Sequence, residues 1–439
     1  MSWDSDESQL VERVVQQRWY GGKSRDVAHA QIVDSVVLRA AEPEYAICLA
    51  ELRYDTGAHD IYQLLRPEAE SFGIARELVS AMRSGLTLQG TEGIVELRPV
   101  PGFAGLGREL SEARDVGAEQ SNTSIVFDDE LVLKVFRRLE PGINPELEIL
   151  RFLTEHGFPN IAALGGWYSY SGGPLAATLG IVQEYVRGGL DGWELALNEL
   201  ADEPERFLSR LGRLGEVTGE MHSVLASNSS DPAFCPESPS VEALGLLTAT
   251  VDEEIERVFL SLQDEDEAVS PIAGRGEEVR DLLRQMTHAG AAGQFIRTHG
   301  DYHLGQTMWA GDDWVILDFE GEPARSLAER RRKRSALRDV AGMLRSFAYV
   351  ASAVSLLRDV EPPDGWEEQA RARFLEGYFE TVDSSLLPAG HAAIDRLLAV
   401  FELEKAVYEL QYELDNRPGW VGIPVRGIQR LLEESATPA

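Results

Sequence analysis

The chain has 439 residues, 44% of them apolar and 26% charged, which is enough for a hydrophobic core in two or three domains. It carries 41 basic and 74 acidic residues, so the formal net charge is −33. Such a charge repels phosphate backbones and anionic lipids and attracts cations, including Mg²⁺ and protonated amines. We therefore expect no nucleic-acid partner and no membrane partner.

Cysteine usage and hydropathy suggest a compartment. The two cysteines, Cys48 and Cys235, form no CxxC motif, which argues against a disulfide framework or a zinc site. We find no uninterrupted apolar run near the roughly 20 residues that a membrane span needs. The first residues are acidic rather than basic, unlike a signal peptide. We expect a cytoplasmic protein.

The first hundred residues alternate short apolar runs with Gly, Asp and Pro, a pattern typical of strands and turns. We expect a helix over residues 8–20 and another over 73–82. An antiparallel meander is predicted for residues 32–38, 45–54 and 61–65, with a further strand at 94–100. Residues 1–100 are therefore expected to form a small mixed subdomain.

Residues 101–187 are expected to form a second, sheet-containing subdomain. The pattern over 116–127 is strand, polar turn and strand, and a further strand follows at 131–136, with Lys134 in its middle. An amphipathic helix is predicted over 146–156, and a strand at 176–182 leads into a linker at 184–189.

Residues 188–439 are mainly helical in pattern, except for short strands within 295–319. The expected helices span residues 193–200, 205–226, 241–262, 276–288, 335–357, 367–382 and 390–414. The fold class is therefore α+β and bilobal, with a sheet-rich small lobe and a helical large lobe. This order is typical of nucleotide-binding enzymes, but a fold alone does not establish a function.

The densest chemical signal lies between residues 296 and 320. A turn at Gly311-Asp312-Asp313 is flanked by strand-like residues on both sides, which predicts a β-hairpin. A hairpin returns the chain on itself, so Asp318 should come close to Gln306. Asp301 precedes Gln306 by five residues, on the loop that enters the same hairpin.

These oxygen-bearing side chains suit Mg²⁺, which binds one or two protein carboxylates together with water and phosphates. We predict Gln306, Asp318 and Glu320 as metal ligands, the last directly or through water, and Asp301 as the base that takes a hydroxyl proton. The spacing follows the catalytic loop of kinases. Taken singly, an Asp at a strand end is more often a turn former, and a histidine such as His303 is more often structural.

Lys134 interrupts an apolar strand and is predicted to bind the phosphates of ATP, with a helix glutamate as its partner. The alternative is a solubility lysine on an edge strand. We favour Glu148 as the partner, because Glu146 could simply favour the helix dipole. The other predicted ATP contacts come from the polar turn and from the linker backbone, and they are Asn122, Thr123, Ser124, Glu184, Tyr185 and Val186. The turn lacks glycine, so it is not a P-loop.

Residues 299–306 and 316–320, with 122–136 upstream and 408–424 downstream, resemble the actinobacterial maltokinase-like branch of the aminoglycoside phosphotransferase superfamily. This branch has a protein-kinase-like fold and includes maltokinases and glucosamine kinases. The resemblance extends to residues 18–23, 191–193 and 416–420, so it covers nearly the whole chain.

The resemblance implies an N-terminal cap subdomain at 1–100, an intermediate nucleotide-binding subdomain at 101–187 and a helical C-lobe at 188–439, with ATP and Mg²⁺ bound between the lobes. By the same similarity Asp301 is the catalytic base, Gln306 and Asp318 bind the metal, and Lys134 holds phosphates. Acceptor recognition would fall in the C-terminal helix and the segment after it.

In that helix Glu402, Glu409 and Glu413 are seven and four residues apart, so they share one face. Carboxylates bind sugar hydroxyls, and aromatic rings stack on sugar faces. The predicted acceptor-binding residues are Asp301, His303, Tyr408, Glu409, Tyr412, Glu413, Asp415 and Trp420. The alternatives are a solvated acidic face for the glutamates and core packing for the tyrosines.

An acidic pocket would favour a cationic acceptor through charge-assisted hydrogen bonds. We therefore favour the glucosamine-kinase side of the resemblance, for which the acceptor would be the 6-hydroxyl of D-glucosamine. Maltose, phosphorylated on its anomeric hydroxyl, is the main alternative, and the residues alone do not choose between these hydroxyls. An aminoglycoside phosphotransferase, a nucleotide-binding pseudokinase and a scaffold protein are weaker alternatives. His222 is expected to pack structurally near the catalytic loop. The basic stretch 325–338 either neutralises a loop near the active site or only balances charge, and we favour the latter.

Overall fold

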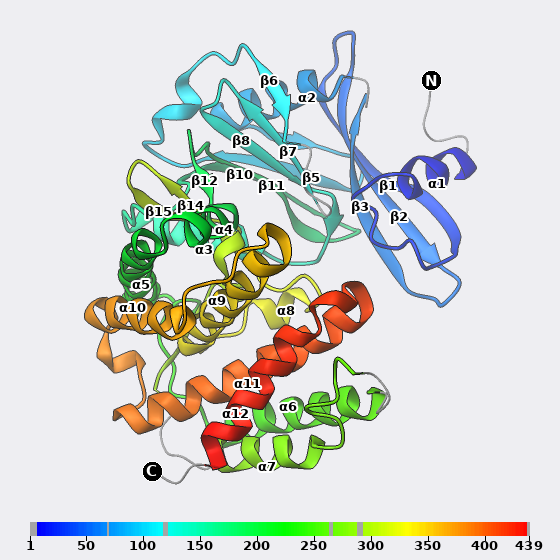
Figure 1. The fold of residues 1–439 in the computed structure, drawn as a ribbon. Helices are drawn as coiled ribbons and strands as arrows, with labels where there is room; N and C mark the ends of the chain where they lie inside the picture. The colour runs from blue at the N-terminus through cyan, green and yellow to red at the C-terminus, as the bar shows by residue number, and fades with distance from the viewer. Residues whose placement is uncertain (1–6, 68–69, 117–121, 263–266, 288–292, 437–439) are drawn as a thin grey trace. The chain divides into compact units, whose positions relative to one another are not determined.

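The computed structural model describes residues 7–67, 70–116, 122–262, 267–287 and 293–436. The chain divides into two compact units, one made of residues 1–188 with 325–327 and the other of residues 189–324 with 328–439. Figure 1 shows that strands dominate the first unit and helices the second. The expected α+β class, with a sheet-rich part followed by a helical part, is confirmed.

The first unit begins with an antiparallel sheet in the order β1-β2-β3-β9. Its strands are β1 (Val27–Arg39), β2 (Tyr45–Tyr54), β3 (His59–Arg66) and β9 (Arg138–Leu139). The predicted meander is thus confirmed, although β1 starts five residues earlier than expected. Helix α1 (Glu7–Val15) buries Leu10 and Val14 in one apolar cluster with residues of this sheet.

A second antiparallel sheet has the order β4-β5-β10-β11-β8-β7-β6. Its strands are β4 (Thr87–Gln89), β5 (Gly93–Pro99), β6 (Ala113–Asp115), β7 (Asn122–Phe127), β8 (Leu131–Phe136), β10 (Leu164–Gly172) and β11 (Ala176–Glu184). Because β5 pairs with β10, this sheet spans residue 100, where we expected a boundary. Helices α2 (Ser71–Arg83) and α3 (Pro145–Glu155) pack against it.

Strand β10 was not predicted, since its glycines and serines hide the apolar period. Its buried tyrosines instead satisfy buried polar groups of the other sheet. Tyr168 donates a hydrogen bond of 3.0 Å to Gln63, and Tyr170 one of 2.6 Å to Asp34. These two bonds join the two sheets of the first unit.

The second unit is built mainly from helices. They are α4 (Gly192–Asp202), α5 (Pro204–Leu225), α6 (Val241–Ser261), α7 (Gly276–Thr287), α8 (Leu327–Arg330, whose first residue belongs to the first unit), α9 (Leu337–Arg358), α10 (Trp366–Thr381), α11 (His391–Asn416) and α12 (Gly422–Ala436). Helices α6, α7, α11 and α12 share one apolar core. Helices α5 and α10 approach so closely that a Cβ on Gly215 would lie 2.0 Å from the carbonyl oxygen of Phe374.

Helix α9 is long and apolar enough to cross a membrane by length and composition, but 67% of its apolar window is buried inside the protein. A buried core helix passes the same test, so this is weak evidence for a span. Two buried charges interrupt its apolar sequence, Asp339 and Arg345. Both organise the candidate site.

Candidate active site

The predicted hairpin is present. Strand β14 (Thr307–Ala310) pairs with β15 (Asp313–Ile316), and the turn is Gly311-Asp312, with Asp313 already in the strand. Both turn residues have positive φ, 58° and 66°, as a tight two-residue hairpin turn with strand-matching twist requires. Beyond the strands, the Leu317 amide donates to the Gln306 carbonyl at 2.9 Å, which extends the pairing to the residue before Asp318.

This pairing brings two predicted metal ligands together. The Gln306 side-chain amide donates a 3.1 Å hydrogen bond to Asp318 Oδ2, which leaves the amide oxygen Oε1 as a possible ligand. Asp318 and Glu320 offer carboxylate oxygens within 4.8 Å of each other. Such an all-oxygen donor set fits Mg²⁺. Asp318 also has a positive φ of 59°, which is uncommon outside glycine and is often found at functional sites.

The loop that carries Asp301 is anchored by Asp339 of α9. The carboxylate of Asp339 accepts hydrogen bonds from the amides of His299 at 2.7 Å and Gly300 at 3.0 Å. It also accepts from Nε2 of the buried His222, at 3.2 Å. Burial opposes its ionisation, but the hydrogen bond and charge interaction with His222, the charge interaction with His299 and the Gly300 amide hold the pKa of Asp339 below its ordinary value. The expected structural role of His222 is therefore confirmed.

His299 ties this loop to the end of the hairpin. Its Nε2 donates to the Leu317 carbonyl at 2.8 Å, and its Nδ1 accepts from the Asp301 amide at 3.4 Å. Gly300 adopts a φ of +88°, a conformation that favours glycine. One ring thus fixes the backbone at Asp301 relative to the residue before Asp318.

His303 is half-buried, with Nε2 3.9 Å from Asp301 Oδ2. Its Nδ1 accepts a hydrogen bond from the Gly305 amide at 3.1 Å. Burial lowers the pKa of the imidazole; the carboxylates of Asp301 and Asp318 oppose this, and Lys405 adds to it. His303 is therefore neutral at neutral pH and carries its proton on Nε2, facing Asp301.

The acidic face of α11 is buried, so the alternative of a solvated face was wrong, while the role of Glu409 and Glu413 in binding the acceptor stays a prediction. Its carboxylates are buried and paired with arginines from other helices or from the next turn. The pairs are Glu402 with Arg371 at 2.7 Å and Arg430 at 2.9 Å, Glu409 with Arg345 at 2.7 Å, and Glu413 with Arg417 at 2.9 Å. These arginines are distant in sequence or lie beyond the helix, so spacing along α11 could not reveal them.

The remaining acceptor candidates lie near the end of α11. Tyr408 is half-buried, with its ring 5.2 Å from Lys405 Nζ, and Tyr412 is 44% exposed, so core packing does not account for it. Asp415 is exposed and accepts a hydrogen bond from Gln411 at 2.8 Å. Trp420 stacks on Tyr349 at 6.2 Å between ring centroids.

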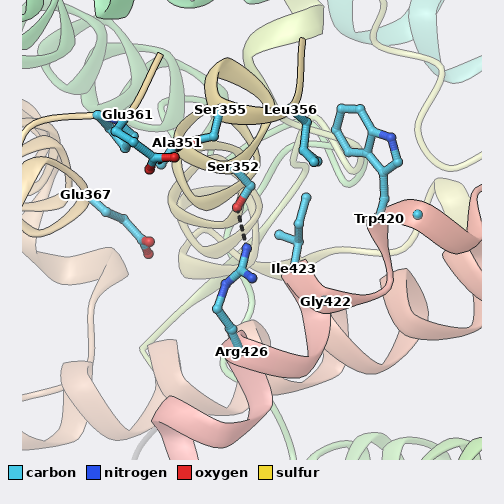
Figure 2. A pocket seen from close by; sticks show the side chains of 12 residues that line it. Ala351, Ser352, Ser355, Leu356, Glu361, Glu367, Trp420, Gly422, Ile423 and Arg426 are labelled. Atoms are coloured by element: carbon cyan, nitrogen blue, oxygen red, sulfur yellow. Dashed lines mark hydrogen bonds between the residues drawn. The ribbon is translucent and has the colours of Figure 1, made fainter. Parts of the chain in front are cut away.

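Trp420 also lines a pocket of about 460 Å³, shown in Figure 2. The pocket is formed by the end of α9, the starts of α10 and α12 and the segments between them, and Arg426 bonds Ser352 across it at 2.7 Å. Its size is in the range of small-molecule sites. Within the described part of the chain, its lining includes Trp420 but not Asp301, His303 or Asp318.

In the first unit, Lys134 lies on β8 between β7 and β11, so it is not on an edge strand, and its side chain is 7% exposed. Its Nζ is 2.9 Å from Glu146, the helix glutamate that we did not favour as its partner. Glu148 is also buried, and its role as a partner of Lys134 stays a prediction. Glu146 also lies in the first turn of α3. Its backbone amide donates a 2.8 Å hydrogen bond to the side chain of Asn144, the N-cap of this helix.

The predicted polar turn is only partly described. Asn122, Thr123 and Ser124 belong to strand β7 rather than to a turn, and residues 117–121 lie outside the described residues. Ser124 stands opposite Lys134 in the sheet. The hydroxyl of Thr123 accepts a hydrogen bond from Arg137 at 2.8 Å.

Two backbone amides of the linker already donate hydrogen bonds to other parts of the first unit. The Glu184 amide donates to the Ala163 carbonyl at 2.9 Å, and the Tyr185 amide to the Glu130 carbonyl at 2.8 Å. Any contact of this segment with an adenine edge would therefore use its other backbone groups, such as those of Val186.

Sequence reasoning missed several residues of the site, namely His299, Lys405, Asp339 and Arg345. The available signal for the last two was a buried charge inside an apolar helix. The expectation that the basic stretch 325–338 only balances charge was wrong for Arg338. Its guanidinium is buried between Glu404 at 3.0 Å and Glu322 at 3.4 Å.

Comparison with known proteins supports the resemblance seen in the sequence. Residues 112–321 match the phosphotransferase enzyme family, and residues 14–86 match the maltokinase N-terminal cap domain. A glucosamine kinase of Streptacidiphilus jiangxiensis is 28% identical over 82% of both chains. One of Mycolicibacterium smegmatis is 26% identical over 74% of this chain and 80% of its own.

Solved structures show the same fold. A glucosamine kinase (crystal form B) aligns with a TM-score of 0.76 and 21% identity over 99% of this chain and 100% of its own. A glucosamine kinase in complex with glucosamine, ADP and inorganic phosphate aligns with a TM-score of 0.73 and 23% identity, over 91% and 94%. The chain therefore contains a domain that matches the phosphotransferase enzyme family, over residues 112–321, preceded by a maltokinase-type N-terminal cap domain over residues 14–86.

Proposed function

We propose that the protein is an ATP- and Mg²⁺-dependent sugar kinase that phosphorylates the 6-hydroxyl of D-glucosamine. The observation that carries this proposal is the hydrogen-bonded pair of Gln306 and Asp318 at the base of the hairpin, next to the anchored loop of Asp301. The glucosamine kinases that resemble this chain over most of its length support the choice of acceptor.

In this reaction Asp301 orients the acceptor hydroxyl and takes its proton. The hydroxyl oxygen forms a bond to the γ-phosphorus of ATP while the bond to the bridging oxygen breaks, and ADP leaves. His303, neutral and with its Nε2 proton toward Asp301, is suited to hydrogen-bond the acceptor or the carboxylate. The products are the sugar phosphate, ADP and a proton on Asp301 that passes to solvent.

The phosphates of ATP are held by cationic groups. Lys134 would contact them, with Glu146 fixing its ammonium, and Ser124 stands opposite Lys134 in the sheet. Mg²⁺, when bound through Gln306 and Asp318 with Glu320 nearby, would neutralise phosphate charge during the transfer. Among the proposed ATP contacts, Asn122 and Thr123 carry less weight, because they lie within a strand.

The acceptor would be bound by Tyr408, Tyr412, Asp415 and Trp420, with Asp415 as an exposed carboxylate that can pair with an ammonium group. Maltose is the second candidate. Glu409 and Glu413 would also contribute to the acceptor site, but their pairing with arginines weakens the charge-based argument for a cationic acceptor, and the cap matches the maltokinase type. The pocket beside Trp420 also has room for a neutral sugar ring.

The test is an ADP-release assay of the purified protein with MgATP and a panel of D-glucosamine, glucose, N-acetylglucosamine, maltose and kanamycin. Nuclear magnetic resonance of the product then identifies the phosphorylated hydroxyl. We expect turnover with D-glucosamine and a 6-phosphate product. Preferred turnover of maltose with an anomeric phosphate would select the second candidate, and preference for kanamycin would refute both.

A binding measurement separates a kinase from a scaffold. A kinase should be stabilised against thermal unfolding by ATP, and more strongly with Mg²⁺ than without, because ligands that bind the native state raise its stability. A pseudokinase would also bind ATP but would release no ADP with any sugar of the panel.

A further inference from the structure

Lys405 of α11 contacts the proposed catalytic base, although no sequence motif assigned it a role. Its Nζ is 3.1 Å from Asp301 Oδ1 and 3.6 Å from Glu322 Oε1. The side chains of Lys405 and Asp301 are only 20% and 21% exposed, so water screens the pair poorly. Residues 104 positions apart thus form one partly buried charge pair at the reacting carboxylate.

The surrounding charges keep Lys405 protonated. Burial opposes its charge, but Asp301, Glu322 and Glu409 outweigh burial and raise the pKa of the ammonium. Glu322 has a second cation, Arg338, at 3.4 Å, and Arg338 also pairs with Glu404 at 3.0 Å. Removing Lys405 would therefore leave Glu322 paired, while Asp301 would lose the ammonium that binds its Oδ1.

The two oxygens of Asp301 are in different environments. Oδ1 accepts a hydrogen bond from Lys405, whereas Oδ2 is the oxygen nearest to Nε2 of His303, at 3.9 Å. A base must present one lone pair to the hydroxyl in a fixed direction. An ammonium bound to the opposite oxygen fixes that direction.

We propose that Lys405 is a positioning residue for phosphoryl transfer, which holds Oδ1 of Asp301 so that Oδ2 is turned to the acceptor hydroxyl. The inference rests on the proposed kinase function. It adds a cation from the C-terminal helix to a catalytic loop that has His303, not lysine, two residues after its base.

The test compares Lys405→Met and Lys405→Arg with Lys333→Met as a matched control. Lys333 lies in the same unit and also pairs with a carboxylate, Glu237, outside the proposed site. We expect Lys405→Met to lower kcat by about 10- to 100-fold, as part of the effect of a positioned base, with KM for ATP unchanged. Lys405→Arg should restore part of kcat, and Lys333→Met should leave kcat unchanged.

The pH dependence of kcat distinguishes a positioning role for Lys405 from a purely structural ion pair. Among the described residues, four titratable side chains act on Asp301. His299 accepts from its backbone amide, His303 and Lys405 face its carboxylate, and Tyr408 interacts with it electrostatically. Glu322 lies next to Lys405. Loss of the ammonium should move the acidic limb of the kcat profile to higher pH.

The outcomes separate the two proposals. If the native protein turns over a sugar and Lys405→Met keeps the native kcat and the native pH profile of kcat, the role of Lys405 is refuted. A Lys405→Met protein that only melts earlier, with unchanged kcat per folded molecule, refutes it too. If the native protein turns over no sugar, the kinase function fails and the positioning role fails with it.

Discussion

Gln306 and Asp318, twelve residues apart, are joined by a 3.1 Å hydrogen bond across the base of the β14–β15 hairpin. The bond exists because the Gly311-Asp312 turn sets the register of the two strands, so that Leu317 pairs with Gln306 and Asp318 follows directly. The geometry of the proposed metal site is therefore fixed by local backbone pairing rather than by contacts distant in sequence.

Replacing Asp318 by Asn should weaken Mg²⁺ binding without disturbing the hairpin. Asn tolerates the left-handed conformation of residue 318 almost as well as Asp, so the change mainly removes charge. We expect the Mg²⁺ concentration for half-maximal ADP release to rise about tenfold or more, since a ligating carboxylate is lost.

Asp312→Asn is the matched control for this change. Asp312 also has a positive φ, 66°, but lies exposed at the tip of the hairpin. It should keep the native Mg²⁺ dependence. An equal rise in both variants would show that hairpin strain, and not metal ligation, causes the effect.

Asp301→Asn should abolish turnover while leaving ATP binding largely intact. The amide cannot take the hydroxyl proton, so kcat should fall by about 10² to 10⁴-fold. Calorimetry should give a nearly native affinity for MgATP, because Asp301 is assigned to the acceptor and not to the nucleotide. Native rates of sugar-dependent ADP release would rule out Asp301 as the base.

Much of this fold follows from local pattern. The N-terminal meander, the hairpin and most of the long helices were predicted within a few residues, because each has a clear apolar period and clear turn residues. Strand β10 and helix α12 were missed. In β10 the buried side chains are tyrosines among glycine and serine, and their fit depends on Gln63 and Asp34 of another sheet.

The site was predictable where it depends on chain neighbours and not where it depends on distant helices. The approach of Gln306 to Asp318 needed only a hairpin. The state of Glu409 depends on Arg345, 64 residues away, and Lys405 reaches Asp301 only through the packing of α11. A helical wheel shows which residues share a face, but it does not show which helix packs against them.

The buried carboxylate of Asp339 makes the free energy of unfolding depend on pH in the acidic range. Its pKa lies below the ordinary value of 3.8 in the folded protein, so its ionised form stabilises the fold above that pH. As pH falls below about 4, the unfolded chain takes up the proton first, and this contribution is lost as pH passes down through the folded pKa. Asp339→Asn should therefore lower stability at neutral pH by about 2 kcal/mol and weaken the acid dependence.

Urea unfolding at several pH values measures this effect, with Asp281→Asn as the control. Asp281 is exposed and paired with Arg284 on the surface of α7, where an ion pair contributes little. Its replacement should change the free energy of unfolding by less than about 0.5 kcal/mol. Equal losses in the two variants would contradict the anchoring role of Asp339.

Trp420→Ala tests whether the segment after α11 binds the acceptor. Trp420 stacks on Tyr349, has the Arg417 guanidinium 4.8 Å from its ring centroid, and lines the 460 Å³ pocket, so its indole borders a cavity that can hold a sugar. A stacked aromatic contributes about 1 kcal/mol, and 1.4 kcal/mol corresponds to a factor of ten in affinity. We expect KM for the sugar to rise about five- to tenfold with KM for ATP unchanged, and Trp420→Phe to recover most of the loss. If KM for every sugar stays native in Trp420→Ala, the acceptor binds elsewhere, and the pocket of Figure 2 is not part of its site.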